Sequence, residues 1–253
     1  ECRIDSIAQS WGVISNAADN ERVITAMNAA YRQLVNKEAG IIQLLDPPFD
    51  KSTLNPGYIK GYVPGVRENG GQYTHAAIWF VMALMELKQN EKGWELLQMI
   101  NPLNRGGDEQ SVERYKVEPY VVAADVYAQV SHLGRGGWTW YTGSAGWMYQ
   151  LIIEYFLGMQ KQGNKLYFNP SIPAEWNEFS ITYKYLNTVY VIKVKPTDIP
   201  GAAPRILYNG LPVTDKSVKL INDEGEHMIE VTVNPATKNV SPVTTERVPK
   251  QIY

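Results

Sequence analysis

The hydrophobic pattern of the chain changes at the segment Lys161-Gln162-Gly163-Asn164. Before it, apolar residues recur at the three- and four-residue spacing of amphipathic helices. After it, short apolar runs are separated by turns rich in Pro, Gly, Asn and Asp. Short, regularly spaced strands without helices are typical of an antiparallel β-sandwich. The sequence therefore predicts an α+β chain of two domains, a helical domain over 1–162 and a β-sandwich over 163–253.

The helical part is expected to contain several amphipathic helices and one helix that is buried on most sides. A helical period opens with residues 4–11, and a second helix is expected from a cap near Asn16 or Asp19 to about Leu34. Residues 76–87 are apolar almost all round, as in the innermost helix of a bundle or double-layer barrel. Further helices are expected over 94–100, 109–115 and 142–157.

The second part is expected to hold five strands, over 165–168, 179–184, 189–194, 205–208 and 228–233. The tail from Asn234 is polar and is expected to be loosely held.

Composition excludes several classes of protein. The 253 residues have a formal net charge of -2 and a hydrophobic content of 44%, without the basic excess of a nucleic-acid-binding protein. Cys2 is the single cysteine, which excludes an internal disulfide and favours a reducing compartment. No leader segment or membrane-length apolar run is present, so a cytoplasmic location is expected. The side chains that could act as soft metal ligands are Cys2, His75, His132 and His227. They are scattered through the sequence, so no metal site is predicted.

The stretch Glu118–Tyr149 combines glycines and aromatic residues around the step Thr142-Gly143-Ser144. Thr142 is a natural N-cap, and the small residues after it leave backbone N–H groups open to an oxyanion. Aromatic faces such as that of Trp140, next to polar groups, suit a sugar ring. The sequence therefore predicts an anion-binding site lined by aromatic side chains. The alternative is a glycine-rich turn before a buried helix.

Residues 41–71 form a long loop of prolines and glycines that delivers Arg67 and Glu68 to a Gly-Gly turn just before His75. A cation, a carboxylate and an imidazole brought together can bind phosphate and sugar hydroxyls. The alternatives are a surface pair and a core histidine. Asp125 lies in an apolar stretch and is either a packing residue, the reading we favour, or a member of the site.

Four motifs in order resemble the C-terminal portion of glycoside hydrolase family ninety-four: ENGGQYTH over 68–75, EPYVVAADVY over 118–127, GRGGWTWYTGSAGW over 134–147 and PSIPAEW over 170–176. The resemblance covers essentially the whole chain. It is strongest to the branch of cyclic β-1,2-glucan synthases and β-1,2-oligoglucan phosphorylases within this family of inverting phosphorylases.

The resemblance implies part of a double-layer (α/α)6 barrel followed by a jelly-roll-like sandwich. Such enzymes cleave a β-glucosidic bond of a gluco-oligosaccharide with inorganic phosphate, without another cofactor, and give α-glucose 1-phosphate. By resemblance, His75, Thr142 and Gly143 bind phosphate, and Arg67 and Glu68 line the sugar subsites. We add Asp125 and Trp140 as candidate sugar-binding residues.

This chain departs from the family in two respects. Cellobiose phosphorylases carry lysine where this chain has Arg67 and glutamine where it has Ala124, which favours another linkage such as β-1,2. The family's general-acid aspartate belongs to a motif upstream of the first helix here, so no catalytic acid is expected among residues 1–253, and Glu68 is disfavoured as a substitute beside Arg67. We therefore expect an inactive fragment of a longer enzyme.

A partial barrel exposes apolar helix faces, so we also expect self-association into a homo-oligomer. Membrane tethering of the parent protein stays open. Two other functions remain as alternatives, a non-catalytic carbohydrate-binding protein and an inverting glycosidase on the same barrel.

Overall fold

The computed structural model describes residues 1–173, 175–197 and 204–234. It divides the described chain into two compact units, Glu1–Leu151 and 152–234. The strand β7 (Met159–Gln162) pairs with β8 (Lys165–Phe168) and so belongs to the sheets of the second unit. The division therefore falls earlier than the expected boundary at residue 162.

The first unit is built on helices α1 (Ser6–Ile14), α2 (Asn20–Leu34), α3 (Thr74–Glu86), α4 (Asn90–Ile100), α5 (Glu109–Tyr115) and α6 (Thr142–Gln150). Short 3-10 turns connect them: η1 (Gly57–Gly61), η2 (Pro102–Arg105) and η3 (Val130–His132). Two-residue strands complete the unit: β1 (Ile4–Asp5), β2 (Val35–Asn36), β3 (Ile41–Ile42), β4 (Leu45–Asp46), β5 (Gln72–Tyr73) and β6 (Asp125–Val126).

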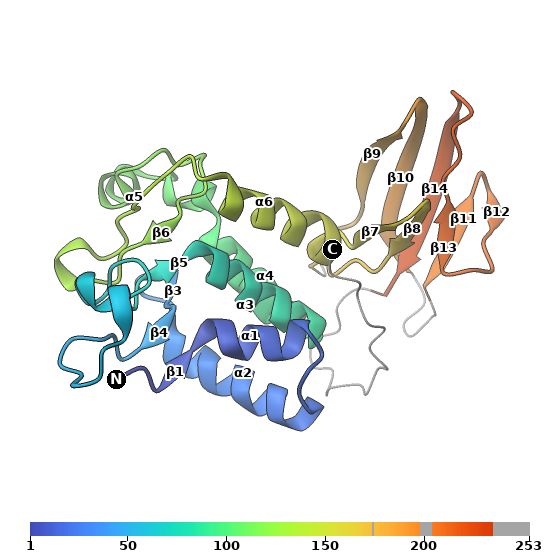
Figure 1. Cartoon of the computed structure of the whole chain (residues 1–253). Helices are drawn as coiled ribbons and strands as arrows, with labels where there is room; N and C mark the ends of the chain where they lie inside the picture. Colours follow the sequence, from blue (N-terminus) through green and yellow to red (C-terminus); the bar gives the residue numbers. More distant parts are fainter. Residues whose placement is uncertain (174, 198–203, 235–253) are drawn as a thin grey trace. The chain divides into compact units, whose positions relative to one another are not determined.

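The expected central helix is confirmed. Helix α3 contacts α1, α4 and α6, and Figure 1 shows it among them. Ten of its residues are buried, including Phe80 and Leu84, because its sequence offers no polar face. This packing fixes the position of the start of α3, and with it that of the half-buried His75.

The first two helices begin where aspartates cap them. The Asp5 carboxylate accepts from the Ala8 N–H at 2.9 Å, and the Asp19 carboxylate accepts from the Glu21 N–H at 3.0 Å. Ile4 therefore lies in β1, before α1, although its sequence spacing fits a helix. The expected cap at Asp19 and the end of α2 at Leu34 are confirmed.

Helix α6 passes into a π-helical turn at Leu151–Phe156. The helical segment thus ends near the expected residue 157, and Gly158, which follows, has a φ of +71°. A side chain at residue 158 would also meet the Asn169 backbone at 2.2 Å.

The second unit contains two sheets with a common hydrophobic core. One has the order β12-β11-β14-β10-β9, and the other has the order β13-β8-β7. Their bounds are β9 (Phe179–Tyr185), β10 (Thr188–Pro196), β11 (Arg205–Tyr208), β12 (Leu211–Pro212), β13 (Ser217–Lys219) and β14 (Glu226–Val233). Leu166 and Val218 of the smaller sheet pack in one cluster with Ile192 and Ile229 of the larger one. This unit is therefore a β-sandwich.

The expectation of a purely antiparallel sandwich is wrong. Strands β10 and β14 pair in parallel, from Val189 with Glu226 to Pro196 with Val233. Strands β11 to β13 lie between them in the sequence, which gives the chain room to return and run in the same direction. The tail expected to be loosely held lies, beyond Asn234, outside the described residues.

Tyr190 provides a test of the sandwich core. It is fully buried, and its hydroxyl accepts from the Ile221 N–H at 2.7 Å and donates to the Ile221 carbonyl at 3.1 Å. Tyr190→Phe leaves both groups unpaired and is expected to cost about 1–3 kcal/mol. Hydrogen exchange of the β10 and β14 amides measures this loss in the sandwich alone.

The matched control is Tyr185→Phe, which removes a hydroxyl from the half-buried Tyr185 on the neighbouring strand. Exchange rates that change equally in both variants would show that the Ile221 hydrogen bonds do not stabilise the sandwich.

Candidate functional site

Backbone pairing assembles the candidate site from three separate segments of the first unit. Strands β5 and β6 pair Tyr73 with Asp125, and the Gly137 N–H donates to the Asp125 carbonyl at 2.8 Å. The Ala124 N–H donates to the Trp138 carbonyl at 2.7 Å. The ends of the motifs at 68–75, 118–127 and 134–147 therefore lie side by side.

His75 and Gly143 are in direct contact range. A Cβ built on Gly143 would lie 2.7 Å from Nε2 of His75, so only a glycine leaves the imidazole room at the start of α6. Thr142 and Gly143 are exposed, and His75 is half-buried. The structure thus brings together the three residues expected to hold phosphate.

Thr142 is not the N-cap that we expected. Helix α6 starts at Thr142, Tyr141 occupies the cap position, and no side chain caps the helix. The extended conformation of Tyr141, with φ -79° and ψ 120°, shifts the start by one position. The N–H groups of the first turn therefore lack a side-chain acceptor, which is the state in which a helix start attracts an anion.

Aromatic rings surround the His75 imidazole. It stacks on Tyr73 with ring centroids 5.4 Å apart, and Trp79 lies at 5.9 Å. Burial lowers the pKa of His75, so the neutral ring is favoured. Its buried Nδ1 atom and the buried Ser144 hydroxyl have no hydrogen-bond partner among the described residues. A polar ligand between α3 and α6 would supply such partners.

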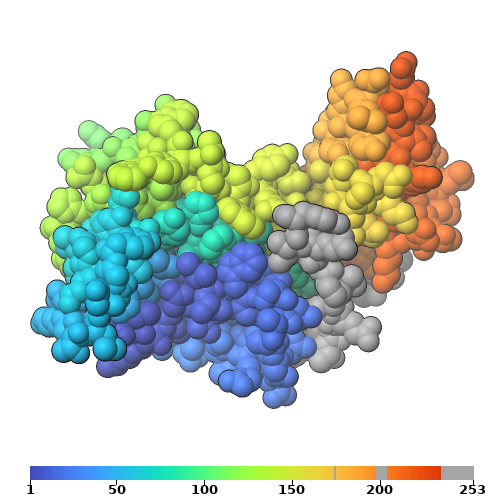
Figure 2. Space-filling view, in the orientation of Figure 1, coloured from blue at the N-terminus to red at the C-terminus, as the bar shows by residue number. Residues whose placement is uncertain are grey.

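Arg67 lies on an aromatic face. Its guanidinium carbon is 3.2 Å from the ring centroid of Trp138, which in turn stacks on Tyr141 at 5.4 Å. Tyr62 approaches the guanidinium at 5.6 Å. Figure 2 shows the segment around residues 50–70, in light blue, next to the yellow-green segment that carries Trp138. These contacts hold the cation in place before any ligand binds.

Asp125 is buried, with 2% of its surface exposed. Its Oδ1 atom accepts from the Trp138 N–H at 3.2 Å, which agrees with the packing role. Its Oδ2 atom and Oε2 of Glu68 are buried and have no partner among the described residues. Burial raises the pKa of Asp125, and Glu68 adds to this effect, while the Trp138 N–H and Arg67 oppose it. The two carboxylates are therefore placed to accept hydroxyl groups.

Trp140 is held outside this cluster. It is 67% exposed, and its indole N–H donates to the Glu118 carboxylate at 3.0 Å. Its ring meets Tyr120 edge-on at 6.5 Å. Among the described residues no contact joins Trp140 to His75 or Asp125, so the structure does not bring it to the other candidates.

Tyr73 is a further candidate site residue, which the sequence did not indicate. Its ring stacks on His75, and burial together with the negative charge of Glu68 raises the pKa of its phenol. Tyr73 ends strand β5 and His75 lies in the first turn of α3, so the strand periodicity of the sequence does not indicate that their rings stack.

Neither a metal-binding cluster nor a membrane-spanning helix is found in the described part of the chain. No group of three or more potential metal ligands occurs within 1–173, 175–197 and 204–234. Over the same residues, no helix is long and apolar enough to cross a membrane.

Aromatic faces beside carboxylates, next to a helix start that attracts anions, are features of proteins that act on carbohydrates. Comparison with known proteins specifies the family. Residues 1–158 match the glycosyl hydrolase 94 superfamily, catalytic domain, and the chain belongs to this superfamily. The resemblance seen in the sequence motifs is thereby confirmed.

Three relatives illustrate the similarity. A cyclic beta-(1,2)-glucan synthase of Rhizobium meliloti is 49% identical over 77% of this chain and 7% of the relative. An N,N'-diacetylchitobiose phosphorylase of Vibrio proteolyticus is 27% identical over 84% of this chain and 26% of the relative. A 1,2-beta-oligoglucan phosphorylase of Listeria innocua is 28% identical over 43% of this chain and 11% of the relative. The chain thus matches only a minor part of each relative's length.

Proposed function

We propose that this chain is part of an inverting β-glucan phosphorylase or synthase that acts on β-1,2-glucosidic bonds and uses inorganic phosphate without another cofactor. The helical unit would be a portion of an (α/α)6 barrel, and the sandwich would have the jelly-roll form. Two observations support the β-1,2 linkage. The chain is 49% identical in sequence to a cyclic β-1,2-glucan synthase, and Arg67 and Ala124 replace the lysine and glutamine of cellobiose phosphorylases.

The contact between His75 and Gly143 carries the proposal. A phosphate dianion bound at the start of α6 would accept from the N–H groups of its first turn, from the Thr142 hydroxyl and from the imidazole. Because phosphate is already anionic, it can attack the anomeric carbon without a general base. This places the nucleophile next to the aromatic and carboxylate side of the site.

The sugar is proposed to lie against Arg67, Glu68 and Asp125. The two unpaired carboxylate oxygens would accept sugar hydroxyls, and Arg67 would present its free edge from the Trp138 face. Trp140, exposed beside Tyr120, would contact a more distant sugar unit of the oligosaccharide.

In the reaction, a phosphate oxygen forms a bond to the anomeric carbon while the glucosidic C–O bond breaks. The leaving oxygen must receive a proton from an acid. We place this acid outside residues 1–253, because Glu68 is assigned to the sugar hydroxyls and Asp125 is buried and accepts from the Trp138 N–H.

The test is release of glucose 1-phosphate from β-1,2-, β-1,3- and β-1,4-linked gluco-oligosaccharides, with and without phosphate. We expect no release by the 253-residue chain and phosphate-dependent release from the β-1,2 substrate by a chain extended upstream of Glu1. Release by the shorter chain would refute the assignment of the acid and direct attention to Asp125. Free glucose, formed without phosphate, would instead indicate a glycosidase, and phosphate-independent sugar binding without turnover would indicate a binding protein.

A further inference from the structure

A second polar cavity lies in the first unit and shares no residue with the candidate site. Its volume is about 230 Å³. It is enclosed by the turn between β2 and β3, the end of α4, η2 and α5, and its lining includes Gly40, Asn104, Arg105, Ser111, Arg114 and Gly134.

Arg105 enters this cavity with its charge unbalanced. One terminal nitrogen donates to the carbonyls of Gly40 and Met99, and the guanidinium lies 5.5 Å from the Tyr115 ring centroid. No carboxylate among the described residues is within ion-pairing distance of Arg105. Burial lowers the pKa of Arg105, and the charge of Arg114 adds to this effect. A partly buried cation of this kind stabilises an anion that binds to its remaining N–H groups.

Arg114 brings a second guanidinium to the same cavity. Its side chain crosses Gly134, where an added Cβ would lie 2.9 Å from Cδ of Arg114. Gly134 has a φ of +83°, so glycine is required there on both grounds. Among the described residues, Arg114 also has no carboxylate within ion-pairing distance.

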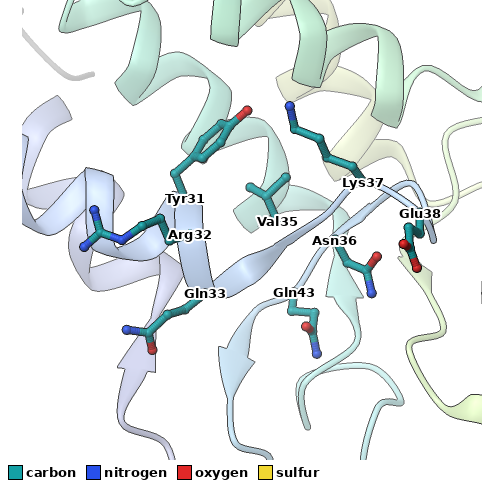
Figure 3. A pocket seen from close by; sticks show the side chains of 8 residues that line it. All are labelled: Tyr31, Arg32, Gln33, Val35, Asn36, Lys37, Glu38 and Gln43. Atoms are coloured by element: carbon teal, nitrogen blue, oxygen red, sulfur yellow. The ribbon is translucent and has the colours of Figure 1, made fainter.

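Most other charged groups around the cavity form interactions outside it. Lys37 pairs with Glu95 at 2.5 Å, and Figure 3 shows it extending on the side of Tyr31. The Asp108 carboxylate accepts from the N–H and hydroxyl of Ser111. Glu38 remains as the one carboxylate in the lining, against two guanidinium groups.

The depression in Figure 3, of about 450 Å³, is different in character. Lys37 in its lining pairs with Glu95, which leaves Arg32 and Glu38 as one cation and one carboxylate, so it has no excess charge that would select a ligand.

We propose that the cavity between Arg105 and Arg114 binds a small oxyanion, a phosphate group that is either free or carried by a sugar phosphate. Arginine forks match the geometry of phosphate oxygens. The volume exceeds what a phosphate group requires and leaves room for an attached sugar ring. Such a ligand would join the β2–β3 turn to α5 and would be a second anion site, separate from His75 and Gly143.

The experiment is calorimetric titration of inorganic phosphate into the full chain carrying Gly143→Ala, so that the His75 site does not contribute. We expect one phosphate to bind, and we expect Arg114→Ala in this background to weaken it about tenfold or more, the effect of losing a charge-assisted hydrogen bond. Arg114 is chosen because Arg105 also braces two backbone carbonyls. Arg32→Ala, an exposed arginine on α2, is the matched charge control and should leave the affinity unchanged.

Two results would overturn the proposal: no measurable binding to the Gly143→Ala chain, or equal affinity with and without Arg114. Arg114→Lys distinguishes loss of a phosphate contact from loss of the folded state in Arg114→Ala. The lysine keeps the charge and should retain part of the affinity. A parallel titration with glucose 1-phosphate identifies the source, since tighter binding than phosphate shows contacts to the sugar. If the Gly143→Ala chain still binds two phosphates, the proposed phosphate site at His75 is wrong. The comparison of Arg114 with Arg114→Ala then still tests the second anion site.

Discussion

The Gly143→Ala variant is expected to bind phosphate at the start of α6 at least about a hundredfold more weakly than the unmodified chain, because two or more charge-assisted hydrogen bonds are lost. The added Cβ would lie 2.7 Å from Nε2 of His75, so the imidazole or the first turn of α6 must move. The methyl group would also occupy space next to the N–H groups that the anion needs. In an enzyme extended upstream, phosphorolysis should fall in parallel.

The measurement is a phosphate titration in the Arg114→Ala background, which removes the contribution of the second anion site. Gly146→Ala is the matched control, because it lies in the same helix and its Cβ meets no atom within 4 Å. That variant should bind phosphate normally and gain helix stability. Equal affinity in the Gly143 and Gly146 variants would contradict a phosphate site at His75.

Local chemistry explains which parts of the fold could be predicted. Strands β8 and β11 have the predicted bounds, because Lys165–Phe168 and Arg205–Tyr208 are rich in strand-forming residues between turn residues. Strand β7 was missed because Met159–Gln162 contains no β-branched or aromatic residue. It forms because it pairs with β8, a tertiary contact that the local sequence does not encode.

The parallel pairing of β10 with β14 is the clearest limit of the sequence reasoning. Both strands have alternating apolar residues, and this pattern fits a parallel or an antiparallel neighbour equally well. Strand direction depends on the elements between the two strands, among which β11 lies on the far side of β14 in the sheet. A pattern of single residues cannot specify such an order.

In the candidate site, too, the sequence predicts some features and tertiary contacts determine the others. The motifs named His75, Thr142, Gly143, Arg67 and Glu68, and the structure brings His75 and Gly143 into contact range. The stacking of Arg67 on Trp138 joins the residue just before one motif to a residue of a distant motif, and nothing in the sequence of either segment indicates it. The sequence therefore identified chemical groups, and the fold determined which of them act as neighbours.

A large loss of stability is expected on substitution of Gly137, which lies directly over the buried Asp125 carboxylate. A Cβ at this position would be 2.2 Å from Oδ1 of Asp125. The carboxylate has little room to move, because it is 2% exposed and accepts from the Trp138 N–H. Gly137→Ala is expected to cost about 3 kcal/mol, at the upper end for overpacking. This loss is measured as the change in the free energy of unfolding of the first unit in urea, monitored by hydrogen exchange of the α3 amides.

The cause can be separated from a general effect of alanine in this loop. If Cβ collides with the carboxylate, then Asp125→Ala creates the missing space, and the double variant should be more stable than the sum of the single effects by about 1–3 kcal/mol. Gly107→Ala, where Cβ meets no atom within 4 Å, should change stability by less than about 0.5 kcal/mol. Additive losses at 125 and 137 would mean that the loop backbone, and not the Asp125 carboxylate, requires glycine. In that case the carboxylate would be free to move toward a ligand, and its proposed role as a fixed acceptor of sugar hydroxyls would fall with it.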